Sequence, residues 1–224
     1  MPSYNAAKFI AASIQSVIGQ TYRNWELLIT DDCSKDDTVK IVEQFLEKDN
    51  RIKLFSTGKN SGPACARNKS LENATGKYIA FLDSDDIWVS NKLETQIQFM
   101  IEKNIAFSFS SYSVIKEDGT PTGNTINVPK VIGYHGYLRN TIIGCLTVII
   151  DREKTGNFIM PNIKSSQDMA LWLLIMKRGF KAYGLQNPLA CYRLVSTSNT
   201  SIKWKAAKDV WKVYREIEHI NPIY

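Results

Sequence analysis

Residues 78–86 read Tyr-Ile-Ala-Phe-Leu-Asp-Ser-Asp-Asp, an apolar run that ends abruptly in three carboxylates. The run is short and rich in aromatic and β-branched residues, which predicts a buried strand over residues 78–82. Because charged side chains are rarely buried without a partner, the acidic end indicates a bound cation. Asp83 and Asp85 stand two positions apart, so both can face one side of an extended backbone and share Mg²⁺ or Mn²⁺. These metals commonly complete their shell with phosphate oxygens, so the pattern predicts a metal–diphosphate site; the alternative is an acidic turn that caps the next helix.

A second acidic cluster follows another expected strand. Residues 25–30 read Trp-Glu-Leu-Leu-Ile-Thr and lead directly into Asp31 and Asp32. In open α/β sheets, ligands bind outside the carboxyl ends of the strands, so we expect both clusters at one shared edge. Asp36 or Asp37 suits the N-cap of the next helix. Asp31 and Asp32 come too early to cap it, which favours a ligand role for these two.

The composition is that of a globular enzyme. The chain has 224 residues, of which 44% are hydrophobic, enough for one core or two merged halves. Its four cysteines form no Cys-x-x-Cys or Cys/His pattern, so neither zinc nor a disulfide framework is indicated, and reduced thiols fit a cytoplasmic protein. No apolar run approaches the ~20 residues that span a bilayer, and the start shows no signal-peptide pattern. The formal charge of +6 is mild and its basic residues are dispersed, which does not indicate a nucleic-acid partner.

Helices and strands are expected to alternate through the first half of the chain. The patterns predict helices over residues 6–20, 38–47, 63–74 and 90–103, and strands over residues 25–30, 52–56, 78–82 and 106–110. This rhythm indicates an α/β fold, a doubly wound and mostly parallel sheet covered on both faces. Further on, we expect a hairpin turn at residues 117–119, extended segments at 128–134, 147–150, 182–185 and 189–194, and a helix over residues 167–178 that Gly179 closes.

The start of the chain is unusual for such a fold. A doubly wound sheet normally opens with a buried strand, yet only residues 1–4 precede the first expected helix. Either the first strand is a stub or the chain has been trimmed or mis-started, and we expect apolar residues upstream of Met1. Losing most of a central strand would cost burial and ladder hydrogen bonds.

The last helix is amphipathic. Its basic stripe is Lys205, Lys208, Lys212 and Arg215, and its apolar stripe is Ala207, Val210, Trp211, Tyr214 and Ile217. Such a helix could lie on an anionic inner leaflet, where lipid-linked acceptors would be found. The alternative is that the apolar stripe packs on the rest of the protein while the lysines are solvated.

Five ordered motifs together carry a family resemblance. They are Pro2-Ser3-Tyr4-Asn5, Asp31-Asp32-Cys33-Ser34 with Asp37-Thr38, Gly62-Pro63-Ala64-Cys65-Ala66-Arg67-Asn68, Asp83-Ser84-Asp85-Asp86, and Gln167-Asp168 with Leu171-Trp172. Each is weak alone, but in this order the chain resembles the family 2 glycosyltransferases of the GT-A fold, most like bacterial enzymes that build surface polysaccharides. The resemblance implies a nucleotide-sugar-binding half (residues 1–110), an acceptor-binding half of the same domain with a smaller antiparallel part (111–200) and a C-terminal amphipathic helix (201–224).

The resemblance also implies a nucleotide site. Asp32 would accept a hydrogen bond from the imide N–H of a pyrimidine base, and Pro2 and Tyr4 would shape the base pocket. Asp83 would hold the ribose or a metal-bound water. Arg67 would pair with these aspartates or with the diphosphate, although a structural ion pair is an equal alternative. Tyr4 could also be a plain packing aromatic.

The implied chemistry is an inverting transfer that needs Mn²⁺ or Mg²⁺ and one base. Asp85, with Asp83, would coordinate the metal, and Asp168 matches the family's base position, where the alternative is a first-turn helix acid favoured by the helix dipole. Two departures stand out. The family usually shows Glu-Asp where this chain has Gln167-Asp168, and many relatives carry a histidine after the Tyr-Arg pair. Here Arg193 or residues 196–201 would approach the diphosphate instead.

The expected function is therefore transfer of a sugar from a UDP- or dTDP-linked donor to a hydroxyl of a glycan or lipid-linked acceptor. The expected location is cytoplasmic, with peripheral contact at the inner membrane through the last helix. The main alternative of another class is a catalytically inactive sugar-nucleotide-binding or scaffolding module. A nucleotidyltransferase would be expected to show a glycine- and basic-rich loop near its start, which residues 1–5 do not show.

Overall fold

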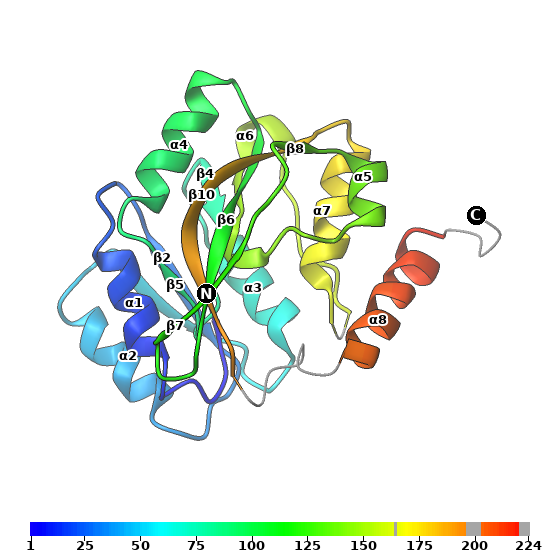
Figure 1. The fold of residues 1–224 in the computed structure, drawn as a ribbon. Coiled ribbons are helices and arrows are strands. Elements are labelled where there is room, and N and C mark those ends of the chain that lie inside the picture. The colour runs from blue at the N-terminus through cyan, green and yellow to red at the C-terminus, as the bar shows by residue number, and fades with distance from the viewer. Residues whose placement is uncertain (164, 196–202, 220–224) are drawn as a thin grey trace.

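The computed structural model describes residues 1–163, 165–195 and 203–219 of the chain. Figure 1 shows a central layer of strands with helices on both faces. The strands are β1 (Pro2–Ser3), β2 (Leu27–Asp31), β3 (Ile52–Ser56), β4 (Tyr78–Ala80), β5 (Ile87–Trp88), β6 (Phe107–Ile115), β7 (Pro121–Ile126), β8 (Val131–Ile132), β9 (Ile149–Asp151) and β10 (Ala182–Arg193). The helices are α1 (Ile10–Ile18), α2 (Thr38–Leu46), α3 (Pro63–Glu72), α4 (Lys92–Glu102), α5 (Tyr134–Arg139), α6 (Arg152–Thr155), α7 (Gln167–Lys177) and α8 (Lys203–Lys212), with a 3₁₀ turn η1 (Cys145–Thr147) and a π-helical turn η3 (Val213–Ile217).

The strands form two sheets. β1, β2 and β3 make a parallel sheet with β2 in the middle. The second sheet has seven strands in the order β4-β9-β6-β10-β5, with β7 added to β6 and β8 added to β10. In it β6 and β10 run parallel, and the other pairs are antiparallel. The result is an α/β architecture in which a three-stranded parallel sheet adjoins a seven-stranded mixed sheet.

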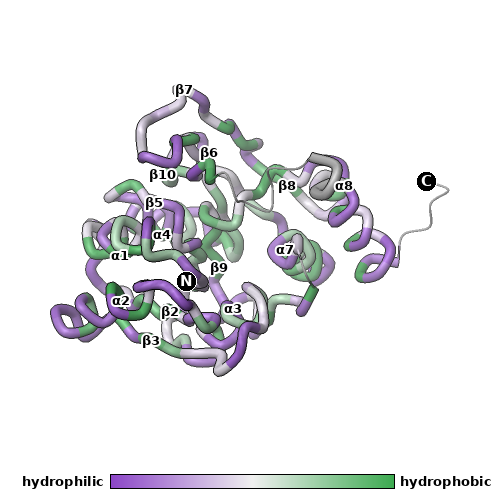
Figure 2. The backbone as a smooth tube through the Cα atoms, turned by 90° about the horizontal axis from the view of Figure 1, so that it is seen from below, coloured by the Kyte–Doolittle hydropathy of each residue, from purple (hydrophilic) through white to green (hydrophobic). Residues whose placement is uncertain are grey.

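Each helix layer buries its own hydrophobic core. On one side α1, α2 and α4 pack on the strands through residues such as Ile10, Val42 and Ile97. On the other side Trp172 of α7 lies at the centre, with ring centroids 5.3 Å from Phe81 and 5.4 Å from Phe107. Figure 2 shows hydrophilic residues collected on outer segments, for example around α2 and β7. Both faces of the strand layer are thus covered, as the apolar strand sequences predict.

Several local predictions are confirmed. Gly62 precedes α3 with φ +87°, a conformation that favours glycine, and Pro63 occupies the first turn, where its missing N–H costs nothing. Gly179 follows α7 with φ +95°. The turn after β6 leads back into β7, with Ile115 paired to Pro121.

Other expectations need correction. The extended segment expected over residues 128–134 contains β8 but ends one residue early, because α5 begins at Tyr134. The two short strands expected after residue 181 are one strand, β10. Pro188, which cannot donate to a ladder, lies inside β10 between two register shifts. The first helix begins at Ile10, because residues 6–9 form a turn around the Ala6 carbonyl.

The C-terminal helix packs on the core cluster around Trp172. Val213 is buried, and Val210, Tyr214 and Ile217 are partly buried against that cluster. Trp211 was expected on the same apolar stripe, but it is 53% exposed. Lys205 and Ala207, also assigned to the stripes, lie outside the residues whose side chains are described. Among the described helices, none is long and apolar enough to cross a membrane.

Candidate active site

The acidic loop, residues 83–86, connects the β4 segment to β5. Arg67 on α3 donates from Nη2 to Oδ1 of Asp83 at 2.5 Å. From the opposite helix layer, the Ser13 hydroxyl of α1 donates to the Ser84 carbonyl at 2.9 Å. The loop closes on itself where the Asp86 N–H donates to the Asp83 carbonyl at 3.2 Å. Its backbone is thus fixed from both faces of the sheet.

Arg193, the last residue of β10, also holds the acidic loop in place. Its backbone N–H donates to Oδ1 of Asp86 at 2.9 Å, and its Nε donates to the Asp85 carbonyl at 2.7 Å. Its Nη1 donates to the Glu117 carbonyl, 3.0 Å away, in the turn between β6 and β7. Arg193 was expected to approach a diphosphate, whereas these contacts make it a buried support of the acidic loop. Residues 196–201, the other candidates for that contact, lie outside the described part of the chain.

The carboxylates of the loop repel one another in a partly dry environment. Burial raises the pKa of Asp85 to about 6, and the negative charge of Asp83 adds to this effect. Burial, with the charges of Asp85 and Asp83, raises the pKa of Asp86 well above its usual value. A cation between such groups would relieve the repulsion.

These residues fit a divalent metal that completes its shell elsewhere. Asp85 and Asp83 offer hard oxygen donors, and Asp83 has a second oxygen besides the one that pairs with Arg67. Within the described ranges, no three His, Cys, Asp or Glu side chains form a ready-made metal cluster. Mg²⁺ and similar ions are commonly held by one or two carboxylates together with phosphate oxygens and water, which is the shell available here.

Asp168 lies in the first turn of α7 and belongs to the same charged cluster. Its neighbour Gln167 is buried; Gln167 Oε1 accepts from Arg67 Nη1 at 3.2 Å, and its amide donates to the Ile163 carbonyl at 2.9 Å. Burial raises the pKa of Asp168, and the positive charge of Arg67 works against that rise. Arg67 therefore connects the acidic loop of β4 with the start of α7, two regions 16 and 100 residues away from it in sequence.

Asp32 sits where β2 ends, beside the end of β1. Its Oδ1 accepts from the Thr57 hydroxyl and the Ser61 N–H, both at 2.8 Å, and its Oδ2 accepts from the Gly62 N–H at 2.7 Å. A carboxylate has about four lone-pair sites, so the three bonds leave one acceptor position of this buried carboxylate unused. Tyr4 directly follows β1 and is 47% exposed.

Pro2 lies on β1 opposite Thr30 of β2. Pro2 and Asp32 therefore lie at the ends of two adjacent strands. Arg67 forms an ion pair with Asp83, and its positive charge opposes the rise in the pKa of Asp168.

The other early aspartates are structural. Asp31 accepts from the hydroxyl of Ser3 at 3.2 Å and from the N–H and hydroxyl of Ser34 at 2.9 and 2.5 Å, which does not support the ligand role expected for it. Asp36 accepts from the Thr38 N–H at 3.0 Å and from the Ala7 N–H at 3.1 Å, so it ties the start of α2 to the β1–α1 loop.

Sequence reasoning missed the roles of Asp86 and Gln167. The signal for Asp86 was its place directly before the apolar pair Ile87-Trp88, since a carboxylate there is buried and needs a donor. No local signal could reveal that the donor is the backbone of Arg193, 107 residues away. Gln167 was noted only as a departure, yet its amide bridges Arg67 and the loop before α7.

Comparison with known proteins identifies the family. The model of "Glycosyl transferase family 2" matches residues 1–160. A relative from Bacillus subtilis, named a putative teichuronic acid biosynthesis glycosyltransferase TuaG, is 53% identical over 220 residues, which are 98% of this chain and 87% of that protein. The Escherichia coli protein WfgD, named a UDP-Glc:alpha-D-GlcNAc-diphosphoundecaprenol beta-1,3-glucosyltransferase, is 44% identical over 224 residues, 100% of this chain and 86% of its own length.

Solved structures share the fold at low sequence identity. S. aureus TarS in complex with UDP superimposes with a TM-score of 0.75 at 22% identity, over 96% of this chain and 62% of that one. The mannosyltransferase PcManGT from Pyrobaculum calidifontis, in complex with GDP-Man and Mn²⁺, gives a TM-score of 0.73 at 16% identity, over 98% of this chain and 63% of that one. The expected architecture is confirmed, and the chain is an enzyme with the GT-A fold that belongs to the family 2 glycosyltransferases.

Proposed function

We propose that this protein transfers a sugar, with inversion, from a UDP- or dTDP-linked donor to a hydroxyl of a glycan or lipid-linked acceptor in surface polysaccharide synthesis. The names of the two relatives support this: one refers to teichuronic acid biosynthesis, and the other to transfer from UDP-Glc onto a sugar-diphosphoundecaprenol. In this proposal residues 1–110 bind the donor and residues 111–200 the acceptor. The helix at residues 203–217, within the C-terminal region 201–224, packs on the acceptor half.

The observation that best supports the proposal is the pair of hydrogen bonds that Arg67 donates to Asp83 and Gln167. Arg67 reaches Asp83 at 2.5 Å and Gln167 at 3.2 Å, so the acidic loop on the donor side and the α7 start on the acceptor side share one buried guanidinium. A transfer reaction needs the diphosphate and the base on opposite sides of one anomeric carbon. These two hydrogen bonds support such an arrangement, with Asp83 and Asp85 on one side and Asp168 on the other.

The donor nucleotide would lie along the ends of β1 and β2. Asp32 would accept from the imide N–H of the base through its unused acceptor position, while its other bonds keep the loop around Ser61 and Gly62 in place. The exposed ring of Tyr4 would stack on the base, and Pro2 would shape the pocket floor. The ribose would approach Asp83.

Asp85, with Asp83, would hold Mn²⁺ or Mg²⁺ between the loop and the diphosphate. When bound, such an ion neutralises the negative charge that gathers on the leaving diphosphate. The loop itself contributes rigidity, because Arg193 and Ser13 fix its backbone before any ligand arrives. A site prepared in this way loses little free energy to reorganisation.

Asp168 would act as the base. It takes the proton of the acceptor hydroxyl while the hydroxyl oxygen forms a bond to the anomeric carbon. The bond from that carbon to the diphosphate oxygen breaks at the same time, and its electron pair leaves with the nucleoside diphosphate. A pKa that burial has raised makes Asp168 a stronger base than a solvated aspartate.

A peripheral position on the inner face of the cytoplasmic membrane is part of the proposal. Lys208, Trp211, Lys212 and Arg215 are exposed on α8 and the following turn, and they recur at helical spacing. A basic face with an exposed Trp suits an anionic bilayer surface. In a liposome flotation assay, Trp211→Ser should reduce binding to anionic vesicles, with Lys48→Gln in the turn after α2 as control. Flotation that is absent in the unmodified protein would remove the membrane part of the proposal.

Calorimetric titration with UDP, dTDP, GDP and CDP tests the donor site. We expect one pyrimidine diphosphate to bind in Mn²⁺ and to be lost in EDTA, and Asp85→Ala should weaken binding while Glu43→Ala on α2 should not. Equal binding with and without metal would contradict the assignment of Asp85. No binding of any nucleotide by the folded protein would favour the inactive module.

A further inference from the structure

A cavity of about 300 Å³ lies between the loop that precedes α7 and the C-terminal helix, which comprises α8 and η3. Small-molecule sites in proteins begin at about this volume. Among the lining residues, the loop contributes Asn162, Ile163 and Ser165, and the helix contributes Asp209, Lys212 and Glu216. Asp168 does not line the cavity, yet it follows Ser165 by three residues, which span at most about 11 Å. The cavity is thus a separate space close to the proposed base.

The helix wall of this cavity is fixed by buried contacts. Val213 is buried in the core, and the Tyr214 hydroxyl donates to the Leu138 carbonyl of α5. Glu218, directly after η3, is buried and pairs with Lys177 Nζ of α7 at 2.8 Å. These contacts hold the C-terminal helix against α5 and α7, so the polar groups that it brings to the cavity have a defined position.

The loop wall is fixed as well. Asn68 of α3 donates from Nδ2 to the Met160 carbonyl at 2.9 Å and accepts from the Met160 N–H at 2.7 Å. At the other end of the loop, the Gln167 amide donates to the Ile163 carbonyl at 2.9 Å. Asn68 stands next to Arg67 on α3, and Gln167 accepts from Arg67. The loop therefore holds the cavity at a fixed place relative to the charged groups of the site.

The lining has the chemistry that recognises a sugar ring. The Asn162 amide, the Ser165 hydroxyl and the carboxylates of Asp209 and Glu216 can all exchange hydrogen bonds with hydroxyl groups. Apolar side chains complete the lining and offer contact to the C–H groups of a ring; they are Ile163, Val213 and Ile217. A few polar groups on a partly apolar wall are typical of a small-molecule site.

The charge of the lining argues against the other parts of a lipid-linked acceptor. Asp209 and Glu216 are negative and Lys212 is positive, so the described lining residues have a net negative charge, which repels a diphosphate. A lipid chain would take polar groups such as Asn162 out of water without giving them hydrogen bonds. A sugar residue is neutral and rich in hydroxyl groups, and it meets neither penalty.

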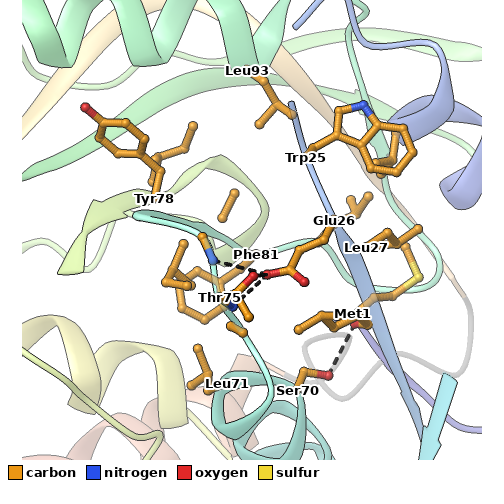
Figure 3. A pocket seen from close by; sticks show the side chains of 18 of the residues that line it. Met1, Trp25, Glu26, Leu27, Ser70, Leu71, Thr75, Tyr78, Phe81 and Leu93 are labelled. Carbon is orange, nitrogen blue, oxygen red and sulfur yellow. Dashed lines mark hydrogen bonds between the residues drawn. The ribbon is translucent and has the colours of Figure 1, made fainter. Parts of the chain in front are cut away.

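A larger cavity, of about 500 Å³, does not offer this chemistry. It lies between β2 and β4, and Figure 3 shows mostly apolar side chains around it, Leu71 and Phe81 among them. The carboxylate of Glu26 in its wall already accepts from the Thr75 N–H at 2.7 Å and from the Thr75 hydroxyl at 2.8 Å (Figure 3). Asp168 and the loop before α7 do not line it. The smaller cavity is therefore the better candidate for an acceptor group.

We propose that the smaller cavity binds a sugar residue of the acceptor, the residue next to the sugar whose hydroxyl reacts. In the proposed function the reacting hydroxyl lies at Asp168, and Asp168 does not line the cavity, so the occupant is a neighbouring unit of the same glycan. This inference rests on the proposed function and narrows it, because the preferred acceptor then has at least two sugar residues.

The test compares two acceptors that end in the same sugar, GlcNAc-diphosphate-lipid and GlcNAc-GlcNAc-diphosphate-lipid. We expect kcat/KM of the unmodified enzyme to be at least about tenfold higher for the two-sugar acceptor, since hydrogen bonds to charged groups have about this effect. Glu216→Ala removes one such group and Ser165→Phe fills the cavity. Each should bring the two acceptors within about threefold of each other and leave kcat/KM for the one-sugar acceptor unchanged. Glu43→Ala on α2 is the control and should keep the full preference.

A binding measurement separates a failure of this inference from a failure of the proposed function. Ligand-observed NMR with the methyl glycoside of GlcNAc-GlcNAc requires no transfer reaction. Binding of this disaccharide that is lost in Ser165→Phe supports the cavity as a sugar site, even where neither lipid acceptor is glycosylated.

Three results would overturn the inference. One is an equal kcat/KM of the unmodified enzyme for the two acceptors. Another is an equal loss for both acceptors in Glu216→Ala and Ser165→Phe, which a purely structural role of these residues would produce. The third is NMR binding of the disaccharide that is absent, or that persists unchanged in Ser165→Phe.

Discussion

The ion pair between Arg67 and Asp83 should be the strongest electrostatic contact of the site, and a double-mutant cycle can measure it. Arg67→Met, Asp83→Asn and the double variant remove one partner, the other and both. The two groups meet at 2.5 Å, and their side chains are 10% and 32% exposed. Removing one partner of a buried pair costs about 3–5 kcal/mol, and the partial exposure of Asp83 lowers our expectation to about 2–3 kcal/mol for each single variant.

The coupling energy should be about 2 kcal/mol, because the double variant leaves no charge unpaired. Urea unfolding of the four proteins at pH 7 gives this quantity directly. The same cycle on Lys40 and Asp37, a pair that is 78% and 70% exposed, should give a coupling too small to measure. A coupling within about 0.5 kcal/mol of zero for Arg67 and Asp83 would refute the assignment of Arg67 as the electrostatic centre of the site.

Three further predictions concern other polar groups of the fold. Lys92 is fully buried, and its ammonium group donates to Gln96. Burial lowers the pKa of Lys92 to about 7. Between pH 7 and 10 the folded protein therefore binds fewer protons than the unfolded protein. Stability should therefore rise with pH across that window, and Lys92→Met should flatten the rise in urea titrations; an unchanged slope would contradict this. Arg193→Gln should lower nucleotide affinity about tenfold, because the acidic loop loses its support, and should cost about 2 kcal/mol of folding stability. Unchanged nucleotide binding in calorimetry would contradict the role of Arg193 as a support of the loop. Asp32→Ala should destabilise the fold by about 2–3 kcal/mol through three lost hydrogen bonds, and a loss below about 0.5 kcal/mol would contradict that accounting.

The donor side of the fold was predictable from the sequence because its signals are local. An apolar run followed by carboxylates marks the end of a strand, and glycine followed by proline marks the start of α3. Asp32 follows β2 directly and Asp83 comes three residues after the end of β4, so both could be placed near strand ends on this basis. Hydrophobic periodicity and turn-forming residues determine structure over a few neighbouring positions, and the helices and strands of this half agree with these local preferences.

The supports of the site could not be predicted because they depend on distant parts of the chain. Arg193 reaches the acidic loop across 108 residues, and Arg67 reaches Gln167 across 100. The acceptor side was harder for a different reason. α5 begins after Gly133 and carries no cap that its sequence announces, and β10 continues past Pro188 because two register shifts absorb it. In each case tertiary packing overrides the local preference.

We propose that Asp168 takes the proton of the acceptor hydroxyl, and the transfer rate of an Asp168 variant measures its contribution to this step. With the donor fixed by nucleotide titration, transfer to a synthetic GlcNAc-diphosphate-lipid is measured in single turnovers for the unmodified enzyme, Asp168→Asn and the control Glu43→Gln. We predict that Asp168→Asn slows transfer by about 100- to 10,000-fold and leaves the affinity for the nucleoside diphosphate within about twofold. A rate within about threefold of the unmodified enzyme would show that Asp168 does not take this proton.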